Sequence, residues 1–97
     1  MSKQFMNVCA HERERLNSKI KASENVLGLY RQLYKTYQEL ERCGEEPAVW
    51  AACKRFIADT VSPSLKKELQ GYKESLELVT QAQTMGCMEI EHGAKHG

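Results

Sequence analysis

Apolar residues recur at helical spacing through the first half of the chain and form two neighbouring stripes. The first stripe advances by steps of four and three residues, a spacing that places its side chains on one face of an α-helix. The second lies about one residue's angle away. A helix that is apolar over such a wide arc has more surface than one short helix can cover. The first stripe is Val26, Tyr30, Leu33, Tyr37 and Leu40, and the second is Leu16, Ile20, Leu27 and Tyr34.

A glycine and a proline mark the end of this helix and the start of the next. Gly44 suits the left-handed residue that ends a helix. Pro47 suits the first turn of a helix, where its missing N–H is no loss. We therefore predict a long helix over about residues 8–43 and a second helix over about 47–60. A break in the long helix near Ser23, with this serine as N-cap, is the alternative.

A second proline-containing segment, Val61–Ser64, also predicts a boundary between two helices. Ser62 can cap the following helix, and Pro63 suits its first turn with a trans peptide bond as the default. The helix should end near Gly86. Residues 87–97 have no core-forming period, and we expect them to form a flexible tail. The apolar stripe that predicts this third helix is Leu65, Leu69, Tyr72, Leu76 and Val79.

These elements predict an all-α fold. Residues 1–86 should form a single helical domain, in which a long N-terminal helix and two shorter helices pack as a small three-helix bundle. A chain of 97 residues can bury enough apolar surface for one core of modest size. The expected core is Val26, Tyr30, Leu33, Tyr37, Leu40, Val49, Cys53, Phe56, Leu65, Leu69, Tyr72, Leu76 and Val79.

The charge is nearly balanced, with 14 basic and 13 acidic residues. A dedicated nucleic-acid binder usually has a basic excess, because neutralised phosphates supply most of its affinity. A basic excess occurs only locally, because residues 1–23 are net basic whereas residues 24–46 are net acidic. Ordinary solvent-exposed helix faces can account for this asymmetry. We find no export signal and no apolar run of membrane-spanning length, and we expect a cytosolic protein with reduced cysteines.

No catalytic motif is visible. The sequence has no phosphate-cradling glycine loop, no nucleophile elbow and no paired-histidine metalloprotease helix. We therefore predict no enzymatic activity and no cofactor. The candidate metal ligands Cys9, His11, Cys87, His92 and His96 lack the closely spaced cysteine pair of structural zinc sites, and we predict no metal.

A helix-turn-helix interpretation takes residues 47–60 and 63–80 as its two helices, joined by a short turn. The would-be recognition helix interleaves its lysines with Glu68, Glu74 and Glu77, which DNA phosphates would repel. Direct DNA binding is therefore disfavoured, and a small DNA-binding regulator is kept as the alternative function.

The opening MSKQFMNVCAHERERL, the segment CGEEPAVWAACKRFIADTVSP and the chain length together resemble the small anti-RecBCD proteins of lambdoid phages. The resemblance covers the whole chain. It implies an early phage protein, located in the host cytoplasm, that binds the host RecBCD helicase–nuclease through its RecC subunit. It also implies a change in the response of RecBCD to Chi sequences that favours phage recombination.

The second apolar stripe is our predicted partner interface, because monomers rarely leave a large apolar patch bare. The alternative is that the N-terminal segment folds back over this stripe. The turn at Pro63 could also present a peptide to a prolyl isomerase, although a structural role is the default. The predicted interface residues are Ile20, Leu27 and Tyr34, flanked by Arg31 and Lys35.

Overall fold

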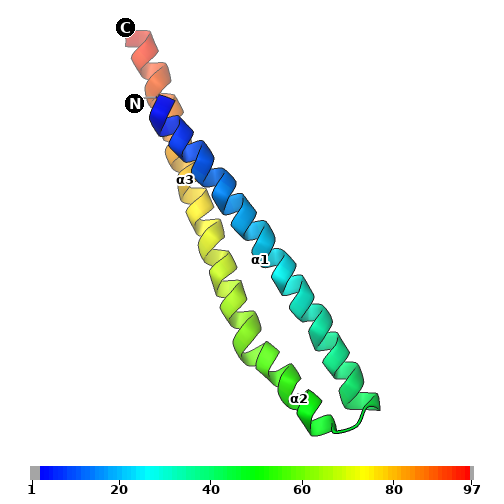
Figure 1. Cartoon of the computed structure of the whole chain (residues 1–97). Coiled ribbons are helices and arrows are strands. Elements are labelled where there is room, and N and C mark those ends of the chain that lie inside the picture. Colours follow the sequence, from blue (N-terminus) through cyan, green and yellow to red (C-terminus); the bar gives the residue numbers. More distant parts are fainter. Residues whose placement is uncertain (1–2, 97) are drawn as a thin grey trace. The chain divides into compact units, whose positions relative to one another are not determined.

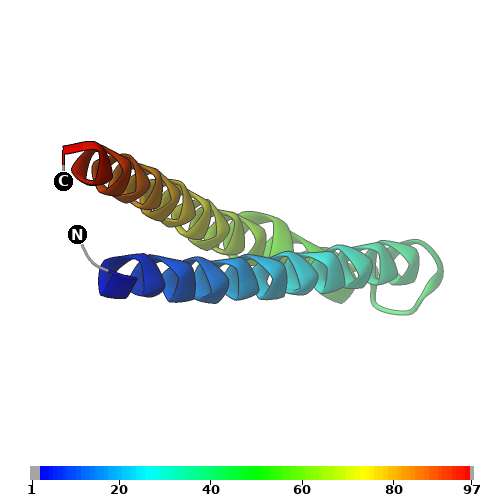
Figure 2. The same cartoon turned by 90° about the horizontal axis from the view of Figure 1, so that it is seen from above.

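The computed structural model describes the backbone of residues 3–96 and the side chains of residues 3–86. The predicted all-α class is confirmed, since residues 3–96 contain helices and one short loop but no strand (Figures 1 and 2). None of the described helices has a stretch long and apolar enough to cross a bilayer. The elements in chain order are α1 (Lys3–Cys43), α2 (Pro47–Phe56), the π-helical turn η1 (Ile57–Val61) and α3 (Ser62–His96).

The chain divides into two compact units, and each is described by itself. Unit 1 combines Met1–Ile20 with Gly71–Gly97, and unit 2 is Lys21–Gln70. In unit 1, the Arg13 guanidinium donates to the Gln83 side-chain oxygen over 3.0 Å. Unit 2 contains the end of α1, the loop, α2, η1 and the first turns of α3. Each unit therefore combines part of α1 with part of the helical run that follows the loop.

The first helix is continuous, as we predicted in preference to a break at Ser23. Gly28 is tolerated within it because a Cβ at this position would meet nothing within 4 Å. Ion pairs one turn apart also support the helix. Arg15 donates to the Glu12 carboxylate, and this hydrogen bond lowers the pKa of Glu12.

The loop between α1 and α2 corrects the role that we predicted for Gly44. The Gly44 N–H donates to the Leu40 carbonyl over 2.7 Å, and a Cβ at Gly44 would lie 2.6 Å from that oxygen. Gly44 thus allows a close backbone approach, while the left-handed residue is Glu46, with φ 56°. Pro47 occupies the first turn of α2, as predicted.

The predicted separation of the second and third helices is wrong. Ser62 has helical dihedral angles, and its N–H donates to the Ile57 carbonyl five residues earlier instead of leaving the helix as a cap. Pro63 follows at once with a trans peptide bond. Because proline cannot donate to the carbonyl four residues back and its ring crowds that carbonyl, a wider turn lets the helix continue. The three-helix bundle is therefore replaced by α1 and one joined run, α2–η1–α3.

The helix end predicted at Gly86 is also wrong, because α3 extends to His96. Gly86 is buried in unit 1, where a Cβ would lie 2.9 Å from the Phe5 ring and 3.3 Å from the Met6 sulfur. This glycine lets α3 approach the first turns of α1. Flexibility of residues 87–97 stays a prediction.

The buried apolar side chains differ from the predicted core. Unit 1 buries Cys9 and Leu16, and unit 2 buries Leu27 and Ile57. None of these four residues belongs to the predicted core, whose members are half-buried apart from four that are exposed. Those four, for which the core prediction is wrong, are Val26, Leu33, Val49 and Phe56.

Candidate functional site

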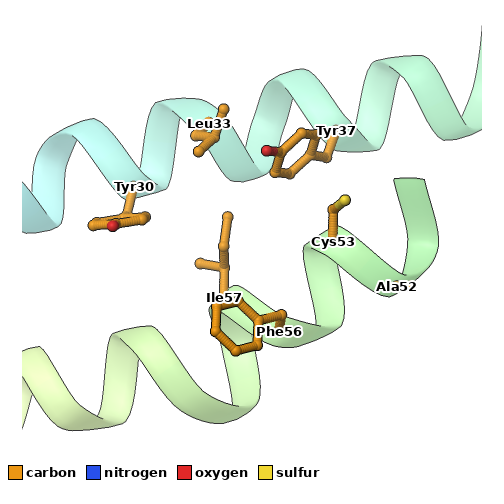
Figure 3. A pocket seen from close by; sticks show the side chains of 7 residues that line it. All are labelled: Tyr30, Leu33, Tyr37, Ala52, Cys53, Phe56 and Ile57. Atoms are coloured by element: carbon orange, nitrogen blue, oxygen red, sulfur yellow. The ribbon is translucent and has the colours of Figure 1, made fainter. Parts of the chain in front are cut away.

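An open apolar groove lies in unit 2 between α1 and the helical run α2–η1 (Figure 3). Its volume is about 410 Å³, which is enough to receive side chains of another molecule. None of its lining residues carries a charge. The groove is lined by Tyr30, Leu33, Tyr37, Ala52, Cys53, Phe56 and Ile57.

Two consecutive residues give the groove its floor and its rim. Ile57 is 4% exposed and points toward α1, whereas Phe56 is 60% exposed (Figure 3). Neighbouring residues of a helix project roughly 100° apart, so one side chain enters the core while the other stays at the surface. The exposed Phe56 ring enlarges the apolar surface of the groove, and contiguous exposed apolar surface marks sites of interaction with other molecules.

An ion pair connects α2 to α1. The Lys54 ammonium lies 2.6 Å from the Glu41 carboxylate, and both side chains are partly shielded. The same ammonium stands 5.7 Å from the centre of the Tyr34 ring, within cation–π range. The hydrogen bond to Glu41 raises the pKa of Lys54. Lys54 therefore stays charged and holds α2 against α1.

Aromatic stacking fixes the start of α2. The Tyr37 and Trp50 rings stack with their centroids 5.8 Å apart, and the Trp50 indole N–H donates to the Glu45 carbonyl over 2.8 Å. Trp50 thus contacts both α1 and the loop. These contacts position the two sides of the groove relative to each other.

A smaller apolar hollow adjoins the groove along α1. It is lined by Val26, Leu29, Tyr30 and Leu33. Leu29 is 64% exposed, and it belongs to neither stripe of the sequence analysis. Since Tyr30 and Leu33 line both hollows, the exposed apolar surface continues from the groove onto the open face of α1.

The residues predicted as a partner interface do not form one exposed surface. Leu27 is 5% exposed within unit 2, and no folded-back N-terminal segment covers it, because α1 is one continuous helix. Tyr34 is half-buried beside Lys54, and Ile20 is half-buried in unit 1. The flanking Arg31 and Lys35 are exposed, as is Pro63, and their contacts with a partner stay predictions.

Sequence reasoning missed the exposure of Phe56 and Leu29. Both stripes of α1 have the same helical period, and periodicity does not tell which of two apolar stripes faces the protein interior. A usable signal was present in the charges. From residue 22 to residue 40, the side of α1 that carries Val26 and Leu29 bears no charged side chain.

A third hollow has different chemistry. It lies at the end of α1 and is lined by Gln38, Glu39, Glu41 and Arg42. Arg42 pairs with Glu39 over 2.7 Å, and hydrogen bonds from Arg42 to Cys43 and Glu39 raise its pKa. Glu41, the other charged lining residue, pairs with Lys54, so the hollow offers little to a charged ligand.

Residues 3–86 contain no group of three or more side chains placed to hold a metal ion. The candidate ligands Cys87, His92 and His96 lie outside the residues whose side chains the structure describes. The groove is thus the strongest candidate site, and its apolar, uncharged and open character is that of a surface for binding protein side chains. No protein family, curated protein or solved structure matches the chain.

Proposed function

We propose that this chain is a non-catalytic modulator that binds the host RecBCD helicase–nuclease through RecC and changes its response to Chi sequences. The uncharged groove of unit 2, with Phe56 exposed at its rim, is the observation that carries the binding role. The partner's identity comes from the resemblance of MSKQFMNVCAHERERL and CGEEPAVWAACKRFIADTVSP to anti-RecBCD phage proteins. The site of action is then the host cytoplasm.

The chemistry of the groove favours binding over catalysis. Its polar groups are the hydroxyls of Tyr30 and Tyr37 and the thiol of Cys53, and no acid–base pair lines it. Aromatic side chains with a polar tip are frequent anchors of protein interfaces. The near-neutral net charge fits a protein surface better than a nucleic-acid backbone.

The exposed cations of α1 and Pro63 are proposed as secondary contacts. Arg31 and Lys35 lie on the charged side of α1 and can pair with acidic groups at the edge of an interface. Pro63 is exposed at the start of α3, where a prolyl isomerase could reach the Ser62–Pro63 bond after local opening of η1. Both contacts add to the groove and do not replace it.

The test measures the affinity of the full chain for purified RecBCD, with Phe56→Ala as the variant and Leu78→Ala as its matched control. Both positions are exposed helical residues, and Leu78 lies outside the groove in unit 1. Truncation of an interface anchor costs about 2 kcal/mol or more, roughly thirtyfold in Kd. We expect a loss of this size for Phe56→Ala and a nearly unchanged Kd for Leu78→Ala, with the same thermal melting in both.

Each part of the proposal can fail separately. Absence of RecBCD binding by the unaltered chain at roughly 10 μM, well above the Kd of a specific complex, would refute the partner. Equal affinity losses in the two variants would refute the groove. Tight, salt-sensitive binding to duplex DNA alone would favour the DNA-binding alternative. If binding holds, Chi-dependent cleavage by RecBCD should change with the unaltered chain and much less with Phe56→Ala.

A further inference from the structure

The open face of α1 carries an apolar seam with coiled-coil spacing. Its positions advance by steps of four, three, four, three and four residues, the heptad alternation that packs one helix along another. The seam lies wholly within unit 2 and runs about 27 Å along the helix axis at 1.5 Å per residue. We call this set the α1 seam: Ala22, Val26, Leu29, Leu33, Thr36 and Leu40.

Most of the α1 seam is exposed. Leu29 is 64% exposed, and Val26 and Leu33 are each exposed to 37%. Thr36 is its one polar member, and the Thr36 hydroxyl donates to the Gln32 carbonyl over 3.1 Å. Because that hydroxyl is satisfied within the helix, the threonine can present its methyl group to a partner.

The positions that flank the α1 seam are almost free of charge. In a coiled coil, charges at such positions select the partner and often keep identical helices apart. Here Glu39, near one end, is the single charged flanking residue. The charged residues Glu24, Arg31 and Lys35 lie on the opposite side of the helix. The flanking residues are Ser23, Asn25, Tyr30, Gln32, Tyr37 and Glu39.

We infer that a second copy of this chain covers the α1 seam, with the two α1 helices antiparallel. In that register Leu29 faces Leu33 of the second copy, and Ala22 faces Leu40 of the second copy. At the two ends of the seam a small alanine then meets a large leucine, as close packing requires, while two leucines meet nearer its middle. Glu39 falls beside Asn25 of the second copy and meets no like charge. The contact is self-complementary and closes as a two-fold dimer.

This inference goes beyond the proposed function and does not depend on it. The α1 seam and the groove share Leu33, and they adjoin at Tyr30 and Tyr37, which flank the seam and line the groove. Leu29 belongs to the seam alone and Phe56 to the groove alone, so the two surfaces can be altered separately. Failure of self-association would leave the RecBCD test unaffected.

The experiment measures the mass of the full chain by light scattering after size-exclusion chromatography. At roughly 100 μM, a dimer with a micromolar Kd is mostly assembled, and we expect about twice the chain mass of 11.1 kDa. Leu29→Lys should give a monomer with unchanged helical content. The matched control is Leu78→Lys, which places the same charge at an equally exposed helical leucine outside the seam and should remain dimeric.

A mixing experiment tests the antiparallel register. Leu29→Glu and Leu33→Lys should each be monomeric alone. Their mixture should form a heterodimer, because the new carboxylate meets the new ammonium while the other Leu29–Leu33 contact stays apolar. In a parallel pair both changes would face leucine, and the mixture would stay monomeric.

Three results would overturn the inference. The first is a monomeric unaltered chain at roughly 100 μM, a concentration far above a micromolar Kd. The second is dissociation by Leu78→Lys as complete as that by Leu29→Lys. The third is a mixture of Leu29→Glu and Leu33→Lys that fails to assemble, which would refute the antiparallel contact.

Discussion

The Tyr37 and Trp50 rings stack at an interplanar angle of 21°, and this contact joins the last turns of α1 to the first turn of α2. Trp50 also donates to the Glu45 carbonyl, so one side chain connects two helical segments and the loop between them. The groove lies beside this contact, because Tyr37 is one of its lining residues. The stack therefore serves both the stability of unit 2 and the shape of the candidate site.

Trp50→Leu should destabilise the protein. The substitution removes the ring stack and the hydrogen bond while keeping an apolar side chain, and we expect a loss of about 1–2 kcal/mol in the free energy of unfolding. Urea denaturation measures this loss. The control is Val49→Ala at the neighbouring exposed position, which should change stability far less. Equal losses in the two variants would contradict the role of the stack.

Two glycines should respond oppositely to alanine. Gly28→Ala adds a methyl group where nothing lies within 4 Å, so it should raise the free energy of unfolding by about 0.5–1 kcal/mol through higher helix propensity. Gly86→Ala places its Cβ 2.9 Å from the Phe5 ring. That clash should cancel the gain or reverse it. Thermal melting of the two variants separates these outcomes, and equal stabilisation would contradict the tight Phe5–Gly86 contact.

The sequence was a good guide to the helices and a poor one to their exposed faces. Helical period, Gly44 and Pro47 located the end of α1 and the start of α2, because these are local backbone preferences. Burial is decided by contacts between segments. The Val26 stripe and the Leu27 stripe have the same period, and the structure buries Leu16 and Leu27 of the second one.

Two local features also escaped the sequence analysis, for different reasons. A π-helical turn stands where we predicted a helix break. The sequence does not separate the two, because a proline in the first turn of a helix and a proline after a widened turn can have the same neighbours. The residue with a left-handed backbone is Glu46, although a glycine such as Gly44 adopts that conformation at a lower free-energy cost than a glutamate. Gly44 is instead required by its contact with Leu40.

The Lys54–Glu41 pair predicts a dependence of stability on pH. Because folding raises the pKa of Lys54, its contribution is fully present below the ordinary value of 10.5 and is lost as pH rises through the higher folded pKa. The difference in unfolding free energy between the unaltered chain and Lys54→Met should therefore stay constant in the neutral range and shrink in alkaline solution. Urea denaturation at several pH values measures it. A difference that grows with alkaline pH would contradict the pairing.

Pro63→Ala tests why the helix widens at η1. Alanine restores an N–H donor and removes the ring that crowds the preceding turn, so the π-helical turn should relax toward α-helical bonding. We expect the Ser62 N–H to change its acceptor from the Ile57 carbonyl to the Ala58 carbonyl, and stability to rise by about 1 kcal/mol or more. Nuclear Overhauser contacts along residues 57–63 report the turn. A variant that keeps the Ser62–Ile57 hydrogen bond would show that proline is not its cause.

Glu46→Gly should stabilise the loop between α1 and α2. A residue with a side chain pays roughly 1–2 kcal/mol for the left-handed conformation, whereas glycine adopts it freely. Glu46 holds φ at 56° and makes no capping hydrogen bond with its side chain, so little is lost on its removal. Glycine also gains freedom in the unfolded chain, and the expected net increase in the free energy of unfolding is therefore about 0.5–1 kcal/mol.

The matched control is Glu45→Gly in the same loop, where φ is negative and glycine should only destabilise. Chemical denaturation of both variants decides the matter, and a loss of stability in Glu46→Gly would mean that the glutamate side chain contributes more than its strained backbone costs.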